Sequence, residues 1–168
     1  MDMREIMIEK VTVNIGIGEP GERLDNAKIL LERLADGNKP VETHARRRDP
    51  VFKLRKGLAI GTKVTLRGDA AKTFLEKALI AKKKVLKASN FDKQGNFAFG
   101  VAEYIDFPGV KYDPSIEMLG FDVCVSLCRR GRRVSIRKLR PSSVGKRHRV
   151  STEDAMEFAK KVFDVKIE

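Results

Sequence analysis

The segment Lys39–Gly68 has the sequence KPVETHARRRDPVFKLRKGLAIGTKVTLRG. Near its two ends, PVETHA and TKVTLRG alternate polar and apolar residues, which indicates two strands that each bury one face. Eight Lys or Arg side chains follow Lys39, against two acids, Glu42 and Asp49. The segment therefore predicts a sheet with one dry face and one wet, positive face, and a basic loop beside it. Such a surface suits a phosphate backbone.

The charge of the whole chain agrees with this interpretation. The 168 residues include 35 Lys or Arg and 23 Asp or Glu, for a formal net charge of +12. An excess of this size in a chain long enough for one domain indicates a polyanionic partner, nucleic acid ahead of a membrane surface. The stretch from Arg129 to Arg149, both included, holds ten Lys or Arg residues and no acid. A solvated face would mix both signs, so this stretch is expected to be a binding arm.

Other classes of protein find little support. No apolar run approaches the ~20 residues that span a bilayer, and the N-terminus resembles neither a signal nor a transit peptide. We therefore expect a cytoplasmic protein. Cys124 and Cys128 would lie about 13 Å apart along one strand, too far for a disulfide, and are expected to be two buried, reduced thiols. Two cysteines and two scattered histidines, His44 and His148, do not predict a metal site.

The pattern along the chain predicts an α+β fold. Half-buried strands are expected at Ile8–Ile15, Pro40–Ala45 and Gly61–Arg67, and a helix over Glu22–Asp36 that stops at Gly37. A second helix should start with Asp69 as its N-cap and run into KKKVLKAS. The run FAFGVAEY (97–104) should be a strand, and FPGVKYDPS (107–115) a loop. The expected sheet is mostly antiparallel, with helices on one face and the other face open for RNA.

The C-terminal third is expected to extend the same domain. FDVCVSLC (121–128) and RRVSIRKL (132–139) alternate on either side of Arg130–Gly131, which predicts a basic hairpin. Ser151 then starts an amphipathic helix. With no linker or repeat in sight, residues 1–168 are expected to form a single domain, with the basic hairpin and C-terminal helix at about 121–168.

One motif favours a different function. Gly16–Gly21 is a literal GxGxxG between a strand and a helix, the arrangement that lets a backbone approach a dinucleotide pyrophosphate. The strand before it alternates, however, whereas a central parallel strand should be nearly all apolar. A plain glycine-rich turn explains the motif better. An enzyme acting on RNA or a nucleotide remains the alternative, although no catalytic constellation nominates one and no cofactor is expected.

The polar faces of two strands form the clearest physical constellation. Period two places Lys10, Thr12 and Asn14 on one face of the first strand, and Lys63, Thr65 and Arg67 on one face of another. Hydrogen-bonding groups would then lie among cations. An ordinary solvent-exposed face is the competing interpretation. Few aromatic residues fall on these positions, so structured RNA contacted through backbone and 2′-hydroxyls fits better than stacked single strands.

Several long motifs in fixed order resemble the large-subunit ribosomal protein five family. They are EKVTVNIGIGEP (9–20), GNKPVETHARR (37–47), FKLRKGLAIGTKVTLRG (52–68) and FDKQGNFAFGVAEYIDFPGVKYD (91–113). The resemblance covers about Ile8 to Leu127, and the tail with RRGRRVSIRKL resembles the archaeal form. Asn38 stands where many members have Gln.

The resemblance implies a structural, non-enzymatic protein of the large ribosomal subunit that binds 5S rRNA in the central protuberance. The implied partners are 5S rRNA, 23S rRNA, P-site tRNA, neighbouring proteins of the 5S particle, and a small-subunit head protein across an intersubunit bridge. The expected 5S-facing residues are Asn14, Asn38, Thr43, Lys63, Thr65 and Arg67. The loop expected to contact tRNA holds Arg46, Arg47, Arg48, Lys53, Arg55 and Lys56. The basic arm expected to face rRNA holds Arg129, Arg130, Arg132, Arg133, Arg137, Lys138 and Arg140.

Overall fold

The computed structural model describes residues 2–168, which form an α+β fold with one continuous core. The strands and helices in chain order are β1 (Ile6–Gly16), α1 (Glu22–Leu34), β2 (Val41–His44), β3 (Ala59–Leu66), α2 (Gly68–Ala81), β4 (Val85–Leu86), β5 (Phe97–Val101), β6 (Phe121–Arg129), α3 (Arg133–Ile136), α4 (Thr152–Phe163) and β7 (Lys166–Ile167). The expected fold class is confirmed.

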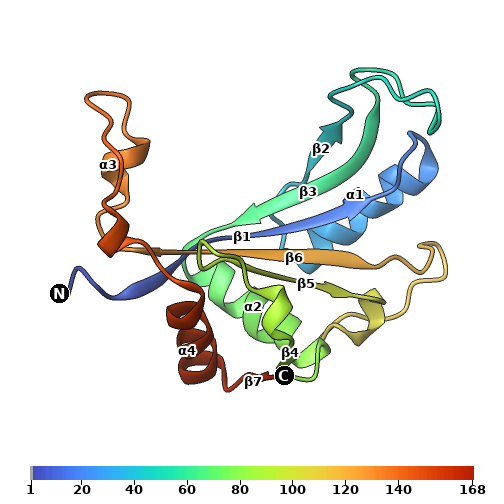
Figure 1. Ribbon diagram of the computed structural model, residues 1–168. Helices are drawn as coiled ribbons and strands as arrows, with labels where there is room; N and C mark the ends of the chain where they lie inside the picture. Colours follow the sequence, from blue (N-terminus) through green and yellow to red (C-terminus); the bar gives the residue numbers. More distant parts are fainter. Residues whose placement is uncertain (1) are drawn as a thin grey trace.

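The main sheet has five strands in the order β2-β3-β1-β6-β5, and every neighbouring pair is antiparallel. Figure 1 shows β1 and β6 running through its centre. A separate parallel pair joins β4 to β7, where Val85 faces Lys166 and Leu86 faces Ile167. This pair fixes the C-terminal end of the chain beside the segment that follows α2.

Apolar residues at alternating positions form the core on one face of the sheet. Val11, Val13 and Ile15 of β1 are almost fully buried, as are Val64 and Leu66 of β3. Helices α1 and α2 cover this face with apolar stripes at helical spacing. Burying one such side chain contributes about 1.5–3 kcal/mol, so the register of the strands is set by this face.

Helix α2 differs from the sequence expectation at both ends. It begins at Gly68, so Asp69 lies in its first turn and is not the N-cap. The positive end of the helix dipole stabilises a carboxylate at this position. The helix ends at Ala81 and does not continue through KKKVLKAS. Lys83 and Lys84 adopt left-handed backbone conformations, with φ of 58° and 55°. This reversal turns the chain so that β4 can pair with β7.

The predicted basic hairpin is wrong. Strand β6 extends to Arg129, but Arg133–Ile136 forms the short helix α3, and residues 137–145 contain no strand. Over Asp122–Val125 both edges of β6 already pair, with β1 and with β5. A returning strand would therefore find a free edge only along Ser126–Arg129, which is too short to pair all eight residues of 132–139. Figure 1 shows the segment leaving the sheet as a separate projection.

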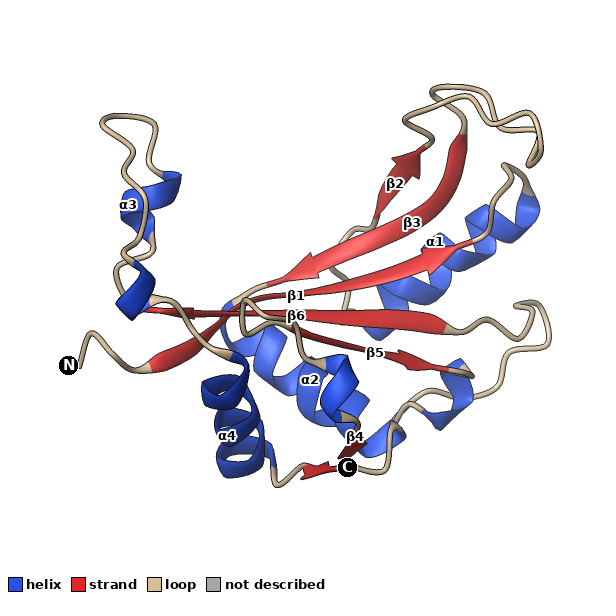
Figure 2. Ribbon diagram, in the orientation of Figure 1, coloured by secondary structure: helices blue, strands red, loops and turns tan. Residues whose placement is uncertain are grey.

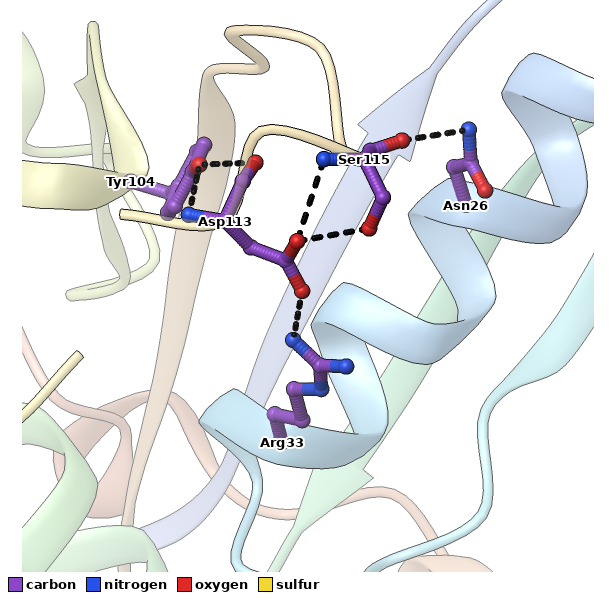
Figure 3. A network of polar contacts seen from close by, with 5 residues as sticks. All are labelled: Asn26, Arg33, Tyr104, Asp113 and Ser115. Atoms are coloured by element: carbon purple, nitrogen blue, oxygen red, sulfur yellow. Dashed lines mark hydrogen bonds and ion pairs between the residues drawn. The ribbon is translucent and has the colours of Figure 1, made fainter. Parts of the chain in front are cut away.

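A polar network ties the loop before β6 to helix α1 (Figure 3). Asp113 accepts hydrogen bonds from the hydroxyl of Ser115 at 2.6 Å and from its backbone N–H at 3.0 Å, and pairs with Arg33 at 2.7 Å. The Asn26 amide donates to the Ser115 carbonyl. The hydroxyl of the buried Tyr104 donates to the Asp113 carbonyl and accepts from the Asp113 backbone N–H. The Pro/Gly-rich loop is therefore held in one position.

These contacts give the loop a specific dependence on pH. The hydrogen bonds of Ser115 and the ion pair with Arg33 lower the pKa of Asp113 to about 2. A lowered pKa stabilises the fold above the ordinary carboxyl value, and the benefit is lost as pH falls from about 4 towards 2. Asp113→Asn should therefore melt below wild type at neutral pH, and the gap should narrow from about pH 4 and close as pH approaches 2. Thermal melts across this range test it, with the exposed Asp106→Asn as control. A gap that is constant with pH would contradict the assignment.

Candidate nucleic-acid interface

The open face of the sheet gathers polar side chains from adjacent strands. The β1–β3 register places Thr12 opposite Thr65 and Asn14 opposite Lys63. Asn14 is half-buried, whereas Lys63 and Thr65 are exposed. Because neighbours on one face lie about 4.5–5.5 Å apart, these groups can contact one ligand together. The polar faces expected from the sequence do share one surface.

Strand β2 adds Thr43 to this surface. Its neighbour Glu42 points the other way, towards α1, where it pairs with Lys28 at 2.7 Å. The hydrogen bond from Lys28 lowers the pKa of Glu42, so this carboxylate stays ionised. Its charge is balanced by Lys28 on the helix side of the sheet. Thr43 faces Gly61, and a Cβ on Gly61 would lie 2.9 Å from the Thr43 Oγ1 and 2.6 Å from the Ile15 carbonyl oxygen. Only glycine lets the strands approach this closely.

Two of the predicted site residues are engaged within the protein. Asn38 lies in the loop after α1, and its amide nitrogen donates to the Ala35 carbonyl at 2.7 Å, which satisfies a carbonyl at the helix end. Arg67 is exposed and reaches the Glu9 carbonyl at 3.4 Å, a long hydrogen bond. Asn38 therefore acts first as a helix-end contact, whereas Arg67 keeps most of its five donors free.

Strand β6 contributes residues to the open face that were not among the candidates. Asn14 pairs with Asp122, and Thr12 pairs with Cys124. The alternation of FDVCVSLC could have revealed this, because it places Asp122, Cys124 and Ser126 on one face. Cys124 is exposed, so the expectation of two buried thiols is wrong for it; Cys128 is buried, because the chain after β6 covers it.

The basic loop between β2 and β3 protrudes from one end of the sheet (Figure 1). Asp49 and Leu54 exchange backbone hydrogen bonds of 3.1 and 2.8 Å, which close a turn over Pro50–Lys53. Val51 and Phe52 at the tip are 83% and 72% exposed. Within the described part of the chain, the six loop cations make no side-chain hydrogen bond or ion pair; they are Arg46, Arg47, Arg48, Lys53, Arg55 and Lys56. Their charges are available to a partner.

The arm, defined here as residues 129–149, projects from the opposite end of the sheet (Figures 1 and 2). Ion pairs fix its base: Arg129 contacts Asp154 at 2.7 Å, Arg130 contacts Glu5 at 3.1 Å, and Arg132 contacts Glu9 at 2.5 Å. The other cations among the candidates are exposed: Arg133, Arg137, Lys138 and Arg140. Three of the seven candidates therefore position the arm, and four are presented to solvent.

Asp154 joins this arm to the last helix. Its backbone N–H donates to the Ser151 hydroxyl, and its carboxylate accepts from the Ser151 N–H, so the two residues form a capping box that starts α4. The Ser151 backbone hydrogen bond, helped by the Ser151 hydroxyl and Arg129, lowers the pKa of Asp154. One carboxylate thus stabilises a helix and holds an arginine of the arm.

Replacing this carboxylate should loosen both elements. We expect Asp154→Ala to lower the free energy of unfolding by about 1–2 kcal/mol, from the lost cap and the unpaired Arg129. Trypsin should also cleave the arm faster. Glu153→Ala removes an exposed acid from the same first helical turn and serves as the control. Equal denaturation midpoints and cleavage rates for the two variants would contradict the anchoring role.

The structure leaves the alternative motifs without support. Gly16–Gly21 forms the turn from β1 to α1, beside an antiparallel sheet that contains no parallel strand–helix–strand unit among the described residues. Within residues 2–168, no three His, Cys, Asp or Glu side chains gather as metal ligands. In the same range, no helix is both long and apolar enough to cross a membrane.

Comparison with known proteins identifies the family. Residues 2–55 match the model described as ribosomal protein L5, and residues 59–166 match the model that describes the C-terminus of the same ribosomal family. The chain belongs to the ribosomal protein L5 family. The two matches meet inside the basic loop, and the pairing of β3 with β1 and β2 joins them in one sheet.

The relatives also confirm the archaeal character of the chain. It is 52% identical to the large ribosomal subunit protein uL5 of Sulfurisphaera tokodaii, over 98% of this chain and 93% of the relative. It is 49% identical to the protein of the same name from Methanococcus vannielii, over 98% and 92%. The chain is therefore a structural, non-enzymatic component of the ribosome, and the alternative of an enzyme is wrong.

Proposed function

We propose that this chain binds 5S rRNA through the open face of its sheet and helps to attach it in the central protuberance of the large subunit. The observation that carries the proposal is the register that sets Asn14 beside Lys63 and Thr12 beside Thr65 on a face that the helices leave uncovered. Amide and hydroxyl groups can fix position on a 2′-hydroxyl or base edge, while the neighbouring cation holds a phosphate.

The residues proposed to contact 5S rRNA are Asn14, Asn38, Thr43, Lys63, Thr65 and Arg67. Asn38 would have to contact RNA with its amide oxygen, because its nitrogen donates to the end of α1. The whole chain acts as one 5S-binding domain of the cytoplasmic large subunit. Neighbouring proteins of the 5S particle would pack beside it, and one side of the molecule would contact a protein of the small-subunit head.

The arm provides a further basic surface for rRNA, including 23S rRNA. Its contacts should come from Arg133, Arg137, Lys138 and Arg140, which are exposed, and less from the three arginines that pair with acids. A charge already paired with a carboxylate gains less from a phosphate than a free one does. Adjacent cations of the arm therefore have different roles: those paired with acids anchor it, and the exposed ones contact rRNA.

The basic loop is proposed to contact P-site tRNA and not 5S rRNA. Arg46→Ala/Arg47→Ala/Arg48→Ala should leave 5S binding largely intact and weaken the contact with tRNA in assembled ribosomes, because the loop protrudes from the sheet. Stability should change by no more than about 0.5 kcal/mol, as is usual at exposed positions. Chemical footprinting of P-site tRNA on variant ribosomes reads the effect. If 5S affinity falls as far as in a sheet-face variant, the loop has been assigned the wrong ligand.

A gel shift tests the main proposal. Labelled 5S rRNA and a random RNA of equal length are titrated with the full chain at one salt concentration. The proposal expects 5S rRNA to bind much more tightly than the random RNA, because the hydrogen-bonding groups add to the charge. Equal affinities would reduce the chain to a non-specific polycation and contradict the proposal.

A further inference from the structure

A cavity of about 390 Å³ lies where the arm leaves the sheet, between the end of β6, the turn before β5 and the segment that leads to α4. Its size falls within the range of about 300–1,000 Å³ that small-molecule pockets in proteins occupy. The cavity is distinct from the central part of the open face, where Asn14, Lys63 and Thr65 lie.

Cationic and apolar side chains line this cavity together. Lys93, Arg129, Arg132 and Arg149 line it together with apolar side chains that include Leu127, Val144 and Val150, and none of the acids among the described residues lines it. Apolar surface beside cations suits a ligand with a flat apolar part and an anionic part. Such a ligand differs from a simple inorganic anion, which needs no apolar surface.

Two of the arginines are held in place by carboxylates that are not among the residues lining the cavity. Asp154 binds Nη2 of Arg129, and Glu9 binds Nη1 of Arg132. Each guanidinium keeps further N–H groups, and the Nε of Arg129 is buried without a hydrogen-bond partner among the described residues. A planar guanidinium fixed in this way can stack on a base or donate to it without losing side-chain freedom on binding.

Lys93, His148 and Arg149 each keep polar groups that can contact a ligand. The Lys93 side chain makes no hydrogen bond or ion pair within residues 2–168, and Arg149 donates only one long hydrogen bond there, to the Val144 carbonyl at 3.3 Å. The Nε2 of His148 lies 2.8 Å from the Arg130 carbonyl. A carbonyl oxygen only accepts, so this nitrogen carries the hydrogen. In the neutral ring, Nδ1 then remains as an acceptor for a ligand N–H or hydroxyl.

We propose that this cavity holds one unpaired nucleotide of ribosomal RNA, with its base against the apolar side chains and the guanidinium groups and its phosphate at Arg149 and Lys93. This inference rests on the proposed RNA-binding function. The base would stack on guanidinium planes, which explains how a surface with few aromatic residues can still accept a nucleotide. The exposed cations further along the arm would hold the adjoining strand.

Cys128 reports on the cavity, because it is buried and lines it, whereas Cys124 lies exposed on the open sheet face. Alkylation of the full chain by iodoacetamide, followed by peptide mass spectrometry, measures both thiols in one sample. Millimolar AMP should slow alkylation of Cys128 and leave that of Cys124 unchanged. Large-subunit rRNA should protect Cys128 at much lower concentration, because a polymer makes many additional contacts.

Matched variants test the phosphate contact. Arg149→Gln should raise the AMP concentration for half-protection about ten-fold, the usual cost of one charge-assisted hydrogen bond. Arg147→Gln removes the same charge from a neighbouring exposed position outside the cavity and should have no effect. Photolabelling with 8-azido-AMP detects binding at the same site independently of the Cys128 thiol. It should modify peptides that contain residues 93–94 and 127–150.

Several results would overturn the inference. Tripolyphosphate that protects Cys128 as well as AMP does would reduce the cavity to a simple anion site. Protection by AMP but not by rRNA would make it a site for a free nucleotide. Labelling elsewhere, with no protection of Cys128, would leave no nucleotide site there. Failure of the proposed function has a separate readout, since 5S rRNA would then leave Cys124 unprotected on the sheet face.

Discussion

Binding of 5S rRNA is expected to weaken by two to three orders of magnitude when monovalent salt rises from about 50 mM to about 200 mM. Each phosphate that a Lys or Arg neutralises releases counterions and contributes roughly 0.7–0.9 to the slope of log affinity against log salt. About six such contacts give a slope of −4 to −5. The exposed cations near the open face and on the arm can supply them: Lys63, Arg67, Arg133, Arg137, Lys138 and Arg140.

Charge-removing variants make this prediction specific to a surface. Lys63→Gln/Arg67→Gln should reduce the slope by about 1.4–1.8, because two contacts are lost. Lys160→Gln/Lys161→Gln removes equal charge from the exposed side of α4 and should leave the slope unchanged. Filter-binding titrations at four or five salt concentrations measure both. An affinity that does not depend on salt, or an equal change in slope for the two pairs, would contradict the electrostatic account.

Sequence patterns predicted the elements whose faces differ most in polarity. In β1, Val11, Val13 and Ile15 must be buried, so period two leaves Thr12 and Asn14 on the other face. In β3 the same alternation leaves Lys63 and Thr65 on the open face, and the structure pairs the two strands directly. The strong apolar stripe and Gly37 likewise defined the length of α1 to within two residues.

The expectations that were wrong depend on distant parts of the chain. RRVSIRKL alternates like a strand, but β1 and β5 occupy both edges of β6 over Asp122–Val125 and leave a free edge only along its last four residues. Helix α2 stops early because β4 pairs with β7, about eighty residues further along the chain. No local pattern contains these pairings, so periodicity alone could not predict them.

The candidate site was predicted in composition but not in the roles of its members. Arg129, Arg130 and Arg132 were grouped with the RNA-facing cations, yet their carboxylate partners are Asp154, Glu5 and Glu9 from other elements. A stretch without acids can still be neutralised in space. Glu42 is an acid inside the basic segment that does not reduce the charge of the open face. Strand alternation points it away from that face and towards Lys28.

Asn14 and Thr65 carry the central claim that the open sheet face recognises 5S rRNA. They lie on adjacent strands at diagonal positions of one face, with Lys63 directly opposite Asn14. Neither side chain makes a hydrogen bond within residues 2–168, so both can bind a 2′-hydroxyl or a base edge. Losing one such bond typically costs about 0.5–1.5 kcal/mol, and more if the RNA group stays buried and unpaired.

The double variant Asn14→Ala/Thr65→Val tests this claim most directly in a filter-binding titration with 5S rRNA at several salt concentrations. A melting curve confirms folding, and Thr73→Val on the exposed side of α2 is the control. The account predicts affinity weakened roughly ten-fold or more, with an unchanged salt slope because no charge is removed. A folded double variant that binds 5S rRNA as tightly as wild type would contradict it.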